Sequence, residues 1–431
     1  MKKTLVVLLI LAVAGGVFAQ EVTWGGAVHG GVNVISGTSS DAKVGADDKA
    51  KDFMYAGGAM TRLRLNVDAQ NDEGTFGANL RIESGDGFNG FAWWKPIDMV
   101  RLQIGSNSDW PFSFDNIVGW NFLQTASDVK VAYSGMSGAD AAAFGGVGPN
   151  SASVLSIYPV DGLEIDVIVP FAPGKTGVGS ANEHPGYGPL TTGDVGYGLT
   201  GFLYDKTRIR VVYTMDGLGS FLVGYKGGRG TIVSDYADYL INIDPTDPDT
   251  WDFKAEGNGG AIFAAADLSI VENLGLYFAL KYTLPAKQDK VGTYNEPIAI
   301  GVGATYAVTD EFGVKLRTGV KLAGKVKADG GDSVNLPMEF GLDVLPYYAV
   351  SESLTAFLNA GFNFTAAEKK IGRDGSVMNW FLNPYVSISE GGGAFYAGLK
   401  LVGNGEVKYV GGGKKKSYVD WSIPIGIAYG F

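Results

Sequence analysis

Apolar and polar side chains alternate with a period of two along the last stretch of the chain, residues 417–431. The odd positions carry large apolar or aromatic side chains: Val419, Trp421, Ile423, Ile425, Ile427, Tyr429 and Phe431. The even positions between them are mostly small or polar. Because successive side chains of a strand point to opposite faces, this stretch predicts a strand with one apolar and one wettable face. A tilted strand of about 9–11 residues crosses a bilayer, so the segment is long enough to do so.

The same alternation continues through the chain in paired segments. Residues 61–70 and 76–83 alternate around a tight turn at 71–74, and residues 274–284 and 314–322 repeat the pattern. Further short turns are predicted at 95–98, 159–162, 204–207, 271–273, 309–311, 351–353 and 390–393. Long polar segments lie between them at 171–194, 243–258, 285–296, 326–333, 367–378 and 403–416. A soluble sandwich has the same period, but short turns at one end and long loops at the other are typical of membrane barrels.

We therefore predict an all-β fold, a transmembrane antiparallel β-barrel with an even number of strands. About 18–20 strands are expected, within a range of about 16–20. The pair of candidate strands between 219 and 240 has the weakest pattern. Proline cannot donate a hydrogen bond to a neighbouring strand, so bulges or strand ends are predicted at Pro337, Pro346, Pro384 and Pro424.

The N-terminal residues 1–19 have the three-part pattern of a cleaved signal peptide. Lys2 and Lys3 precede an unbroken apolar run from Leu5 to Val13, and small residues follow up to Ala19. The apolar run is too short to span a bilayer as a helix, which takes about 20 residues. We expect an exported protein whose residues 20–431 form one barrel domain with long extracellular loops.

Composition agrees with this fold class and excludes some partners. The chain has 65 Gly and 12% aromatic residues, which suits a large barrel with small side chains inside and aromatic girdles outside. It has 0 Cys, so no disulfide framework can form. Without Lys2 and Lys3 it carries 32 basic and 45 acidic residues, a net charge of −13, which argues against nucleic acid as a partner.

Candidate catalytic and metal-binding residues are few. His29 and His184 are the 2 histidines of the chain, and without Cys they do not make a familiar zinc site. No serine stands out as a hydrolase nucleophile. The run Asp244–Asp249 has oxygen ligands suited to calcium, although a solvated loop tip explains it more simply. We expect no enzymatic activity, no cofactor and no metal.

One long segment differs from the other polar loops because it is rich in aromatic residues. Residues 105–120 contain Trp110, Phe112, Phe114 and Trp120 and follow the fifth predicted strand. A loop exposed to water rarely holds four such rings, so we expect this one to fold against a wall.

Two resemblances to known proteins follow from these residues. The aromatic C-terminus resembles the signal by which the outer-membrane barrel assembly machinery recognises its clients, which implies an assembly role for Trp421, Tyr429 and Phe431. The loop after the fifth strand resembles that of general porins, which folds into the barrel and presents acidic residues to an arginine cluster. The resemblance implies a pore constriction at Asp109, Asp115, Arg62, Arg64, Arg81 and Arg101. Alternatively, the arginines are wall charges paired with Asp68 and Glu83.

The expected function is passive diffusion of small hydrophilic solutes and ions through a water-filled channel in the cell outer membrane. Inward basic residues are predicted at positions 62, 64, 81, 101, 208, 210, 281, 315, 317, 321 and 400. Inward acidic residues are predicted at positions 68, 83, 164, 166, 267, 339, 343 and 420. Such a near-balanced polar wall suits non-specific passage. The alternative is a surface adhesin or structural protein that displays its loops on the same barrel. The sequence leaves open whether the barrel forms a homo-oligomer.

Overall fold

A computed structural model describes most of the predicted strand segments. It covers residues 21–38, 52–55, 62–83, 87–105, 152–170, 208–226, 255–256, 261–284, 286–288, 292–295, 298–327, 333–335, 337–369, 374–408 and 414–431. Within these ranges the chain is built from β-strands and turns. No helix in the described ranges has the length and apolar character needed to cross a membrane.

The principal sheet is antiparallel and closes on itself. Its earlier strands are β1 (Glu21–Thr38), β3 (Arg62–Gln70), β4 (Phe76–Glu83), β5 (Gly87–Ile97), β6 (Val100–Gly105), β7 (Ala152–Val160), β8 (Leu163–Pro170), β9 (Arg208–Met215) and β10 (Gly219–Lys226). The later strands are β12 (Ala261–Val271), β13 (Leu274–Thr283), β16 (Ile298–Ala307), β17 (Phe312–Lys321), β20 (Glu339–Ala349), β21 (Leu354–Thr365), β22 (Val377–Glu390), β23 (Gly393–Gly398), β24 (Lys400–Asn404) and β27 (Tyr418–Gly430). Successive strands of this set pair with each other, except that β23 and β24 both lie between β22 and β27, and β1 pairs with β27 to close the ring.

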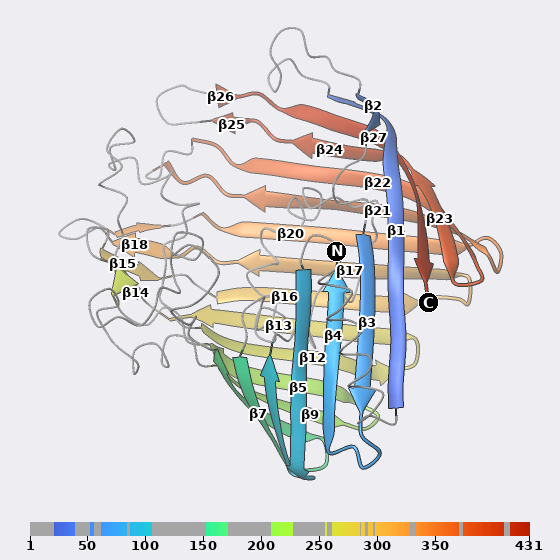
Figure 1. Cartoon of the computed structure of the whole chain (residues 1–431). Helices are drawn as coiled ribbons and strands as arrows, with labels where there is room; N and C mark the ends of the chain where they lie inside the picture. The colour runs from blue at the N-terminus through green and yellow to red at the C-terminus, as the bar shows by residue number, and fades with distance from the viewer. Residues whose placement is uncertain are drawn as a thin grey trace.

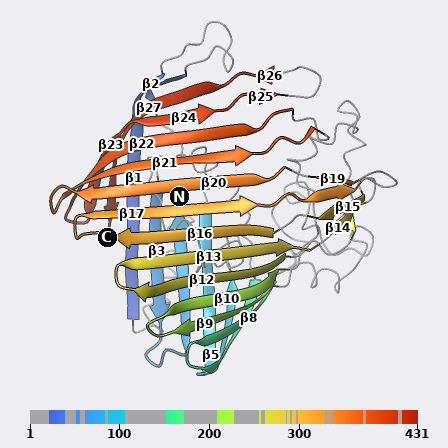
Figure 2. The ribbon, with the colours of Figure 1, turned by 180° about the vertical axis from the view of Figure 1, so that it is seen from behind.

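The barrel wall is 18-stranded. The sheet contains 20 strands, but two of them do not add to the wall count. The short β2 (Asp52–Tyr55) pairs only with β1, and β23 and β24 are successive halves of one wall strand. An even number within the predicted range is therefore confirmed. Figures 1 and 2 show the two walls from opposite sides, with β1, β3, β4 and β5 crossing in front of β12–β22 in Figure 1.

Two small sheets lie outside the barrel wall. One joins β11 (Ala255–Glu256), β14 (Ala286–Gln288), β15 (Gly292–Asn295), β18 (Lys325–Lys327) and β19 (Ser333–Asn335), and the other pairs β25 (Val407–Lys408) with β26 (Lys414–Lys415). These strands belong to the longer connections, at the barrel end opposite the short turns (Figure 1). The long-loop segments predicted at 285–296 and 403–416 thus contain short strands of their own.

The short turns gather at the end of the barrel where β1 begins and β27 ends. They lie at 71–75, 98–99, 161–162, 216–218, 272–273, 308–311, 350–353 and 391–392. Most of these agree with the sequence prediction, while the turn expected at 204–207 lies outside the described residues. Asn273 has a positive φ of 66°, a conformation that Asn tolerates better than most residues and that suits a two-residue hairpin turn.

Apolar side chains cover the outer face of the barrel. Exposed aliphatic residues on it include Val28, Leu63, Ile104, Leu155, Ile209, Val223, Ile262, Leu280, Ile300, Leu358, Val386 and Ile423. Exposed aromatic rings gather towards the short-turn ends of the strands: Trp24, Phe76, Trp94, Tyr213, Tyr306, Phe312, Tyr348, Phe395, Tyr429 and Phe431. Amphipathic rings favour the boundary between hydrocarbon and water, so this ring of residues marks one membrane interface.

The length of the terminal strand fits the thickness of a membrane. Trp421 and Phe431 are 10 residues apart on the outer face. At about 3.3 Å per residue they are separated by about 33 Å along the strand. A strand tilt of about 40° reduces this to a height of about 25 Å, which is the height of the apolar band of outer-membrane barrels.

The prolines interrupt strand pairing as their chemistry requires. Pro384 has no N–H to donate, and Leu399, which lies across from it, marks the break between β23 and β24. Pro424 lies where the register between β27 and β1 shifts, between Asn33 and Ile35. Pro337 precedes the first residue of β20. The predicted bulges or strand ends are confirmed at these three prolines. Pro346 keeps regular pairing with Val314 of β17, but the ladder between β20 and β21 has no pair at Leu345 and Pro346.

Candidate functional site in the barrel interior

The inner face of the wall carries polar and ionised side chains. Buried polar residues on it are Gln103, Ser156, Asp166, Arg210, Arg317, Asp343, Asn359, Asn363, Thr365, Asn383, Ser387, Lys400 and Ser422. They alternate along their strands with the exposed apolar residues of the outer face; Ile104, for example, follows Gln103, and Ile209 precedes Arg210. The period-two pattern of the sequence therefore gives the direction of these side chains correctly.

Two ion pairs bridge neighbouring strands on the inner face. Arg210 of β9 lies opposite Asp166 of β8, and its Nε donates a hydrogen bond to Oδ2 of that carboxylate. Arg317 of β17 lies opposite Asp343 of β20, with its Nη2 and Nε at 2.7 Å and 2.8 Å from Asp343 Oδ2. All four side chains are almost fully buried. Buried charges require such partners, so these pairs fix charge within the wall.

A second part of the inner face is apolar. We call it the inner apolar cluster: Leu222, Ala261, Phe263, Ala265, Tyr277, Ala279, Ala299, Leu345, Phe381, Tyr385 and Val402. Phe357 packs against it, with its ring stacked on that of Tyr385 at a centroid distance of 4.6 Å. Aromatic residues are thus not confined to the outer girdles, because strands such as β22 carry aromatic side chains on both faces.

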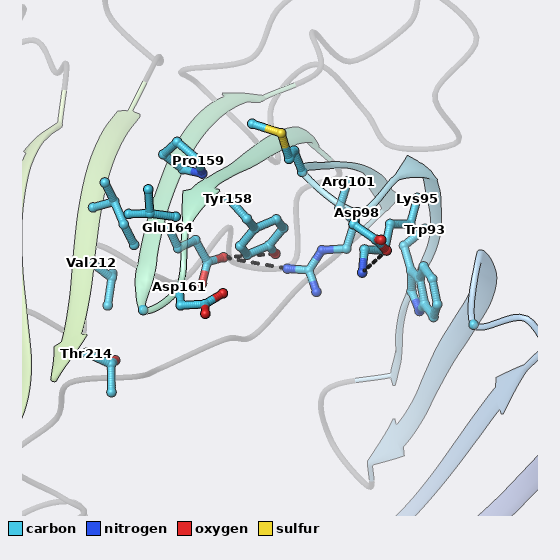
Figure 3. Close-up of a pocket in the computed structure, with 15 residues that line it drawn as sticks. Trp93, Lys95, Asp98, Arg101, Tyr158, Pro159, Asp161, Glu164, Val212 and Thr214 are labelled. Atoms are coloured by element: carbon cyan, nitrogen blue, oxygen red, sulfur yellow. Dashed lines mark hydrogen bonds and ion pairs between the residues drawn. The ribbon is translucent and has the colours of Figure 1, made fainter. Parts of the chain in front are cut away.

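A cavity lies on the inner face of the barrel at the end with the short turns. Its volume is about 800 Å³, and residues from β5 to β9 and from their turns line it (Figure 3). Trp93, Arg101, Tyr158, Glu164 and Val212 contribute side chains from five successive strands. We call this space the mouth cavity. Its volume lies in the usual range for small-molecule sites, about 300–1,000 Å³.

Arg101 is the central charged group of the mouth cavity. Its guanidinium lies 5.8 Å from the centroid of the Tyr158 ring, a distance that allows a cation–π contact. Arg101 Nη2 is 3.7 Å from Glu164 Oε1, which is an ion pair but too long for a hydrogen bond. The Tyr158 hydroxyl donates a 3.4 Å hydrogen bond to the same Glu164 oxygen. Figure 3 shows Arg101 reaching towards Glu164 and Tyr158 from the neighbouring strand.

A second charged pair flanks Arg101. Lys95 Nζ lies 3.2 Å from Asp98 Oδ1, beside the turn that joins β5 to β6. Asp161, in the next turn, is exposed and also lines the cavity. The cavity thus contains two cationic and three anionic side chains within one small volume.

The predicted constriction residues are only partly described. Asp109 and Asp115 lie outside the described residues. Arg64 of β3 lies opposite Glu83 of β4, and Arg62 lies opposite His29 of β1. The opposite positions of Arg64 and Glu83 agree with the alternative in which the arginines pair with carboxylates of the wall.

Arg101 lies apart from the other predicted constriction arginines. Arg81 lies opposite Asn89 of β5, whereas Leu102, the neighbour of Arg101, lies opposite Trp94. These two positions on β5 are five residues apart, which corresponds to about 17 Å along the strand. Arg64, Arg81 and Arg101 alternate with outward apolar residues of their strands and so lie on the inner face. The action of the predicted arginines as one constriction stays a prediction.

The three residues of the predicted assembly signal lie on the outer face of the terminal strand. Trp421, Tyr429 and Phe431 alternate with the buried Ser422, and the rings of Tyr429 and Phe431 stack at a centroid distance of 6.4 Å. Tyr429 and Phe431 are 50% and 58% exposed, so both rings are accessible from the membrane side. Their role in assembly stays a prediction.

The placement of the histidines and carboxylates in the described ranges decides whether they could hold a metal ion. Among those residues, no group of three or more His, Asp and Glu side chains could hold a metal ion. His29 lies on β1, opposite Arg62 and Ala428, and His184 falls outside the described residues.

A comparison with known proteins finds solved structures that match most of the chain at low sequence identity. No protein-family model and no curated protein matches the chain. OpdQ of Pseudomonas aeruginosa matches over 96% of this chain and 99% of its own, with 12% identity and a TM-score of 0.47. The outer membrane channel DcaP of Acinetobacter baumannii matches over 95% and 97%, with 13% identity and a TM-score of 0.45. The outer-membrane expressed OmpT of Vibrio cholerae matches over 95% and 97%, with 10% identity and a TM-score of 0.45.

These similarities are too low to carry any argument about solutes. The class follows from the chain itself, because the ring of strands is closed, the outer face is apolar with an aromatic belt, and the inner face is ionised. The protein is a β-barrel of the outer-membrane type that resembles porins.

Proposed function

We propose that the protein is an outer-membrane porin, a water-filled channel for passive diffusion of small hydrophilic solutes and ions. The observation that carries the proposal is the closed 18-stranded barrel with ionised side chains on its inner face. Barrels of about 16–18 strands leave an aqueous channel, and fixed charges on the wall replace part of the hydration of a passing ion. Passive diffusion needs neither a catalytic residue nor a cofactor.

The proposal includes an export route and a place of assembly. Residues 1–19 would direct the chain across the inner membrane and be removed. The terminal strand, with Trp421, Tyr429 and Phe431, would be bound by the outer-membrane barrel assembly machinery before the apolar band enters the bilayer. Barrels of this kind can associate side by side, and homo-oligomer formation would bury part of the outer face.

The pore would be narrowed by the aromatic segment that follows the fifth strand. Asp109 and Asp115 in that segment would face the inward arginines Arg62, Arg64, Arg81 and Arg101. The support is the position of Arg64, Arg81 and Arg101 on the inner face, together with the four aromatic residues in the sequence of the segment. Opposite charges across a narrow passage interact more strongly than in bulk water and would set the ion preference.

The competing function is a surface adhesin or structural protein that uses the barrel to display its long connections. The small sheets outside the barrel wall favour this alternative, because they add ordered surface at the long-connection end. Single-channel recording of the purified barrel in a planar bilayer separates the two functions. The porin proposal expects stepwise currents, whereas a display scaffold with a closed interior gives none.

A further inference from the structure

The charges in the mouth cavity are arranged in adjacent pairs of opposite sign. Arg101 adjoins Glu164 at 3.7 Å, and Lys95 adjoins Asp98 at 3.2 Å. Asp161 adds a further carboxylate at the rim. A simple anion in this space would meet three carboxylates, and a simple cation would meet two basic groups. A solute that carries both charges close together meets a partner for each.

Arg101 and Glu164 retain hydrogen-bonding capacity for such a solute. Their separation is too long for a direct hydrogen bond, and the buried Nε of Arg101 has no hydrogen-bond partner in the described part of the chain. About a third of each side chain is exposed, 35% for Arg101 and 29% for Glu164. The cation–π contact with Tyr158 holds the guanidinium in place before a solute arrives.

Apolar groups also line the mouth cavity. The side chains of Trp93, Tyr158 and Val212 line it together with the charged groups, as Figure 3 shows. A cavity that combines apolar surface with a few polar groups orients a ligand through its polar end and holds its apolar end.

We propose that the mouth cavity is a recognition site for zwitterionic α-amino acids with apolar side chains. The carboxylate would bind Arg101 and Lys95, the ammonium group would bind Glu164 and Asp161, and the apolar side chain would pack on Trp93 and Tyr158. In an α-amino acid one carbon joins the two charged groups, so their spacing fits the adjacent Arg101 and Glu164. The proposal rests on the channel function, since the solute would enter and leave through the pore.

Calorimetric titration of the folded barrel in detergent tests the site. The probes are L-leucine, N-acetyl-L-leucine, which lacks the positive charge, and L-leucinamide, which lacks the negative charge. Leucine is expected to bind at least about tenfold more tightly than either derivative, because each derivative leaves one charged partner unused. Equal affinities for the three probes, or no binding of leucine, would overturn the proposal.

Single substitutions test which residue binds the carboxylate of the solute and which binds its ammonium group. Arg101→Gln should weaken leucine binding about tenfold and leave leucinamide unchanged, whereas Glu164→Gln should weaken leucine and leave N-acetyl-leucine unchanged. Lys281→Gln, an inward lysine of β13, is the matched control and should change none of the three affinities. If neither Arg101→Gln nor Glu164→Gln alters leucine binding, the site is elsewhere.

A parallel conductance measurement separates this proposal from the channel function. Conducting channels that bind no leucine contradict the site and leave the porin intact. Leucine binding by a barrel that passes no current contradicts the channel and also the entry route that the site requires.

Discussion

Phe431, the last residue of the chain, exchanges two backbone hydrogen bonds with Gly26 of the first strand. The Gly26 N–H donates to the Phe431 carbonyl at 2.8 Å, and the Phe431 N–H donates to the Gly26 carbonyl at 3.1 Å. The Phe431 ring lies over Gly26, because a Cβ at Gly26 would be only 2.7 Å from a ring carbon. The terminal residue therefore takes part in closing the barrel as well as presenting an aromatic ring to the membrane.

The contact between β1 and β27 that closes the barrel leaves no room for a side chain at position 26. In Gly26→Val, the new Cβ would lie 2.5 Å from the Arg64 carbonyl oxygen as well as against the Phe431 ring. We expect a loss of stability of about 1–3 kcal/mol from overpacking, measured by urea unfolding of the refolded barrel. Gly30→Ala is the control, since nothing lies within 4 Å of a Cβ there. Equal stability of the two variants would contradict the close packing of Phe431 and Arg64 against Gly26.

The outer aromatic end of β27 should matter for assembly more than for transport. Replacing Tyr429 and Phe431 with Ser keeps the backbone bonds possible but removes both exposed rings. We expect the variant to accumulate in the periplasm and be degraded, while molecules that do insert conduct normally. Surface levels are measured by the mobility shift between unheated and boiled outer-membrane samples. Wild-type levels of the Ser variant would refute the assembly role.

The buried pair of Arg317 and Asp343 should contribute strongly to stability when one partner is lost. Asp343→Asn removes the carboxylate that the buried Arg317 guanidinium contacts, which is expected to cost about 3–5 kcal/mol in the unfolding free energy. Lys369 and Asp374 form the comparison, because their 2.8 Å ion pair lies outside the barrel and is exposed. The hydrogen bond from Lys369 lowers the pKa of Asp374. Lys369→Gln should bring that pKa back towards its ordinary value without a measurable change in barrel stability. A small effect of Asp343→Asn would show that water reaches the pair.

Alternation was enough to predict the barrel and the direction of its side chains. A period of two assigns each residue to a face, so Arg210, Asp166 and Arg317 were placed inside from sequence. The pattern cannot reveal which inward residues meet, because that depends on the register between strands distant in the chain. Arg101 and Glu164 were both recognised as inward, but their pairing depends on the β6–β7 and β7–β8 registers.

The packing of the inner apolar cluster as a whole could not be predicted from the same pattern. Strands such as β22 carry large apolar residues on both faces, including Trp380 outside and Phe381 inside. Period-two alternation is weak there, and a continuous apolar run does not distinguish a membrane-facing side from a packed inner one. The burial of Phe381 and Tyr385 becomes visible only when the ring of strands is closed.

The aromatic segment from Gly105 to Trp120 is expected to control ion preference. Replacing Asp109 and Asp115 with Asn should shift the preference towards anions, because the wall arginines then dominate. Neutral residues at Arg62, Arg81 and Arg101 should shift it towards cations. The reversal potential in a salt gradient measures both changes. Unaltered reversal potentials in all variants would place the selectivity filter elsewhere on the wall.

Deleting residues 109–120 tests the position of the same segment. If it folds into the barrel, its removal should raise the conductance and admit larger solutes. The mobility shift on heating serves as the control for assembly of the deleted variant. An assembled barrel with unchanged conductance would place the segment outside the pore.

Single-channel recording of the purified, heat-modifiable barrel in a planar bilayer tests the central claim most directly. A water-filled channel predicts discrete current steps whose size rises with the conductivity of the bathing salt solution. The absence of steps from a barrel that is folded and inserted would contradict the porin function and favour a scaffold that displays its loops.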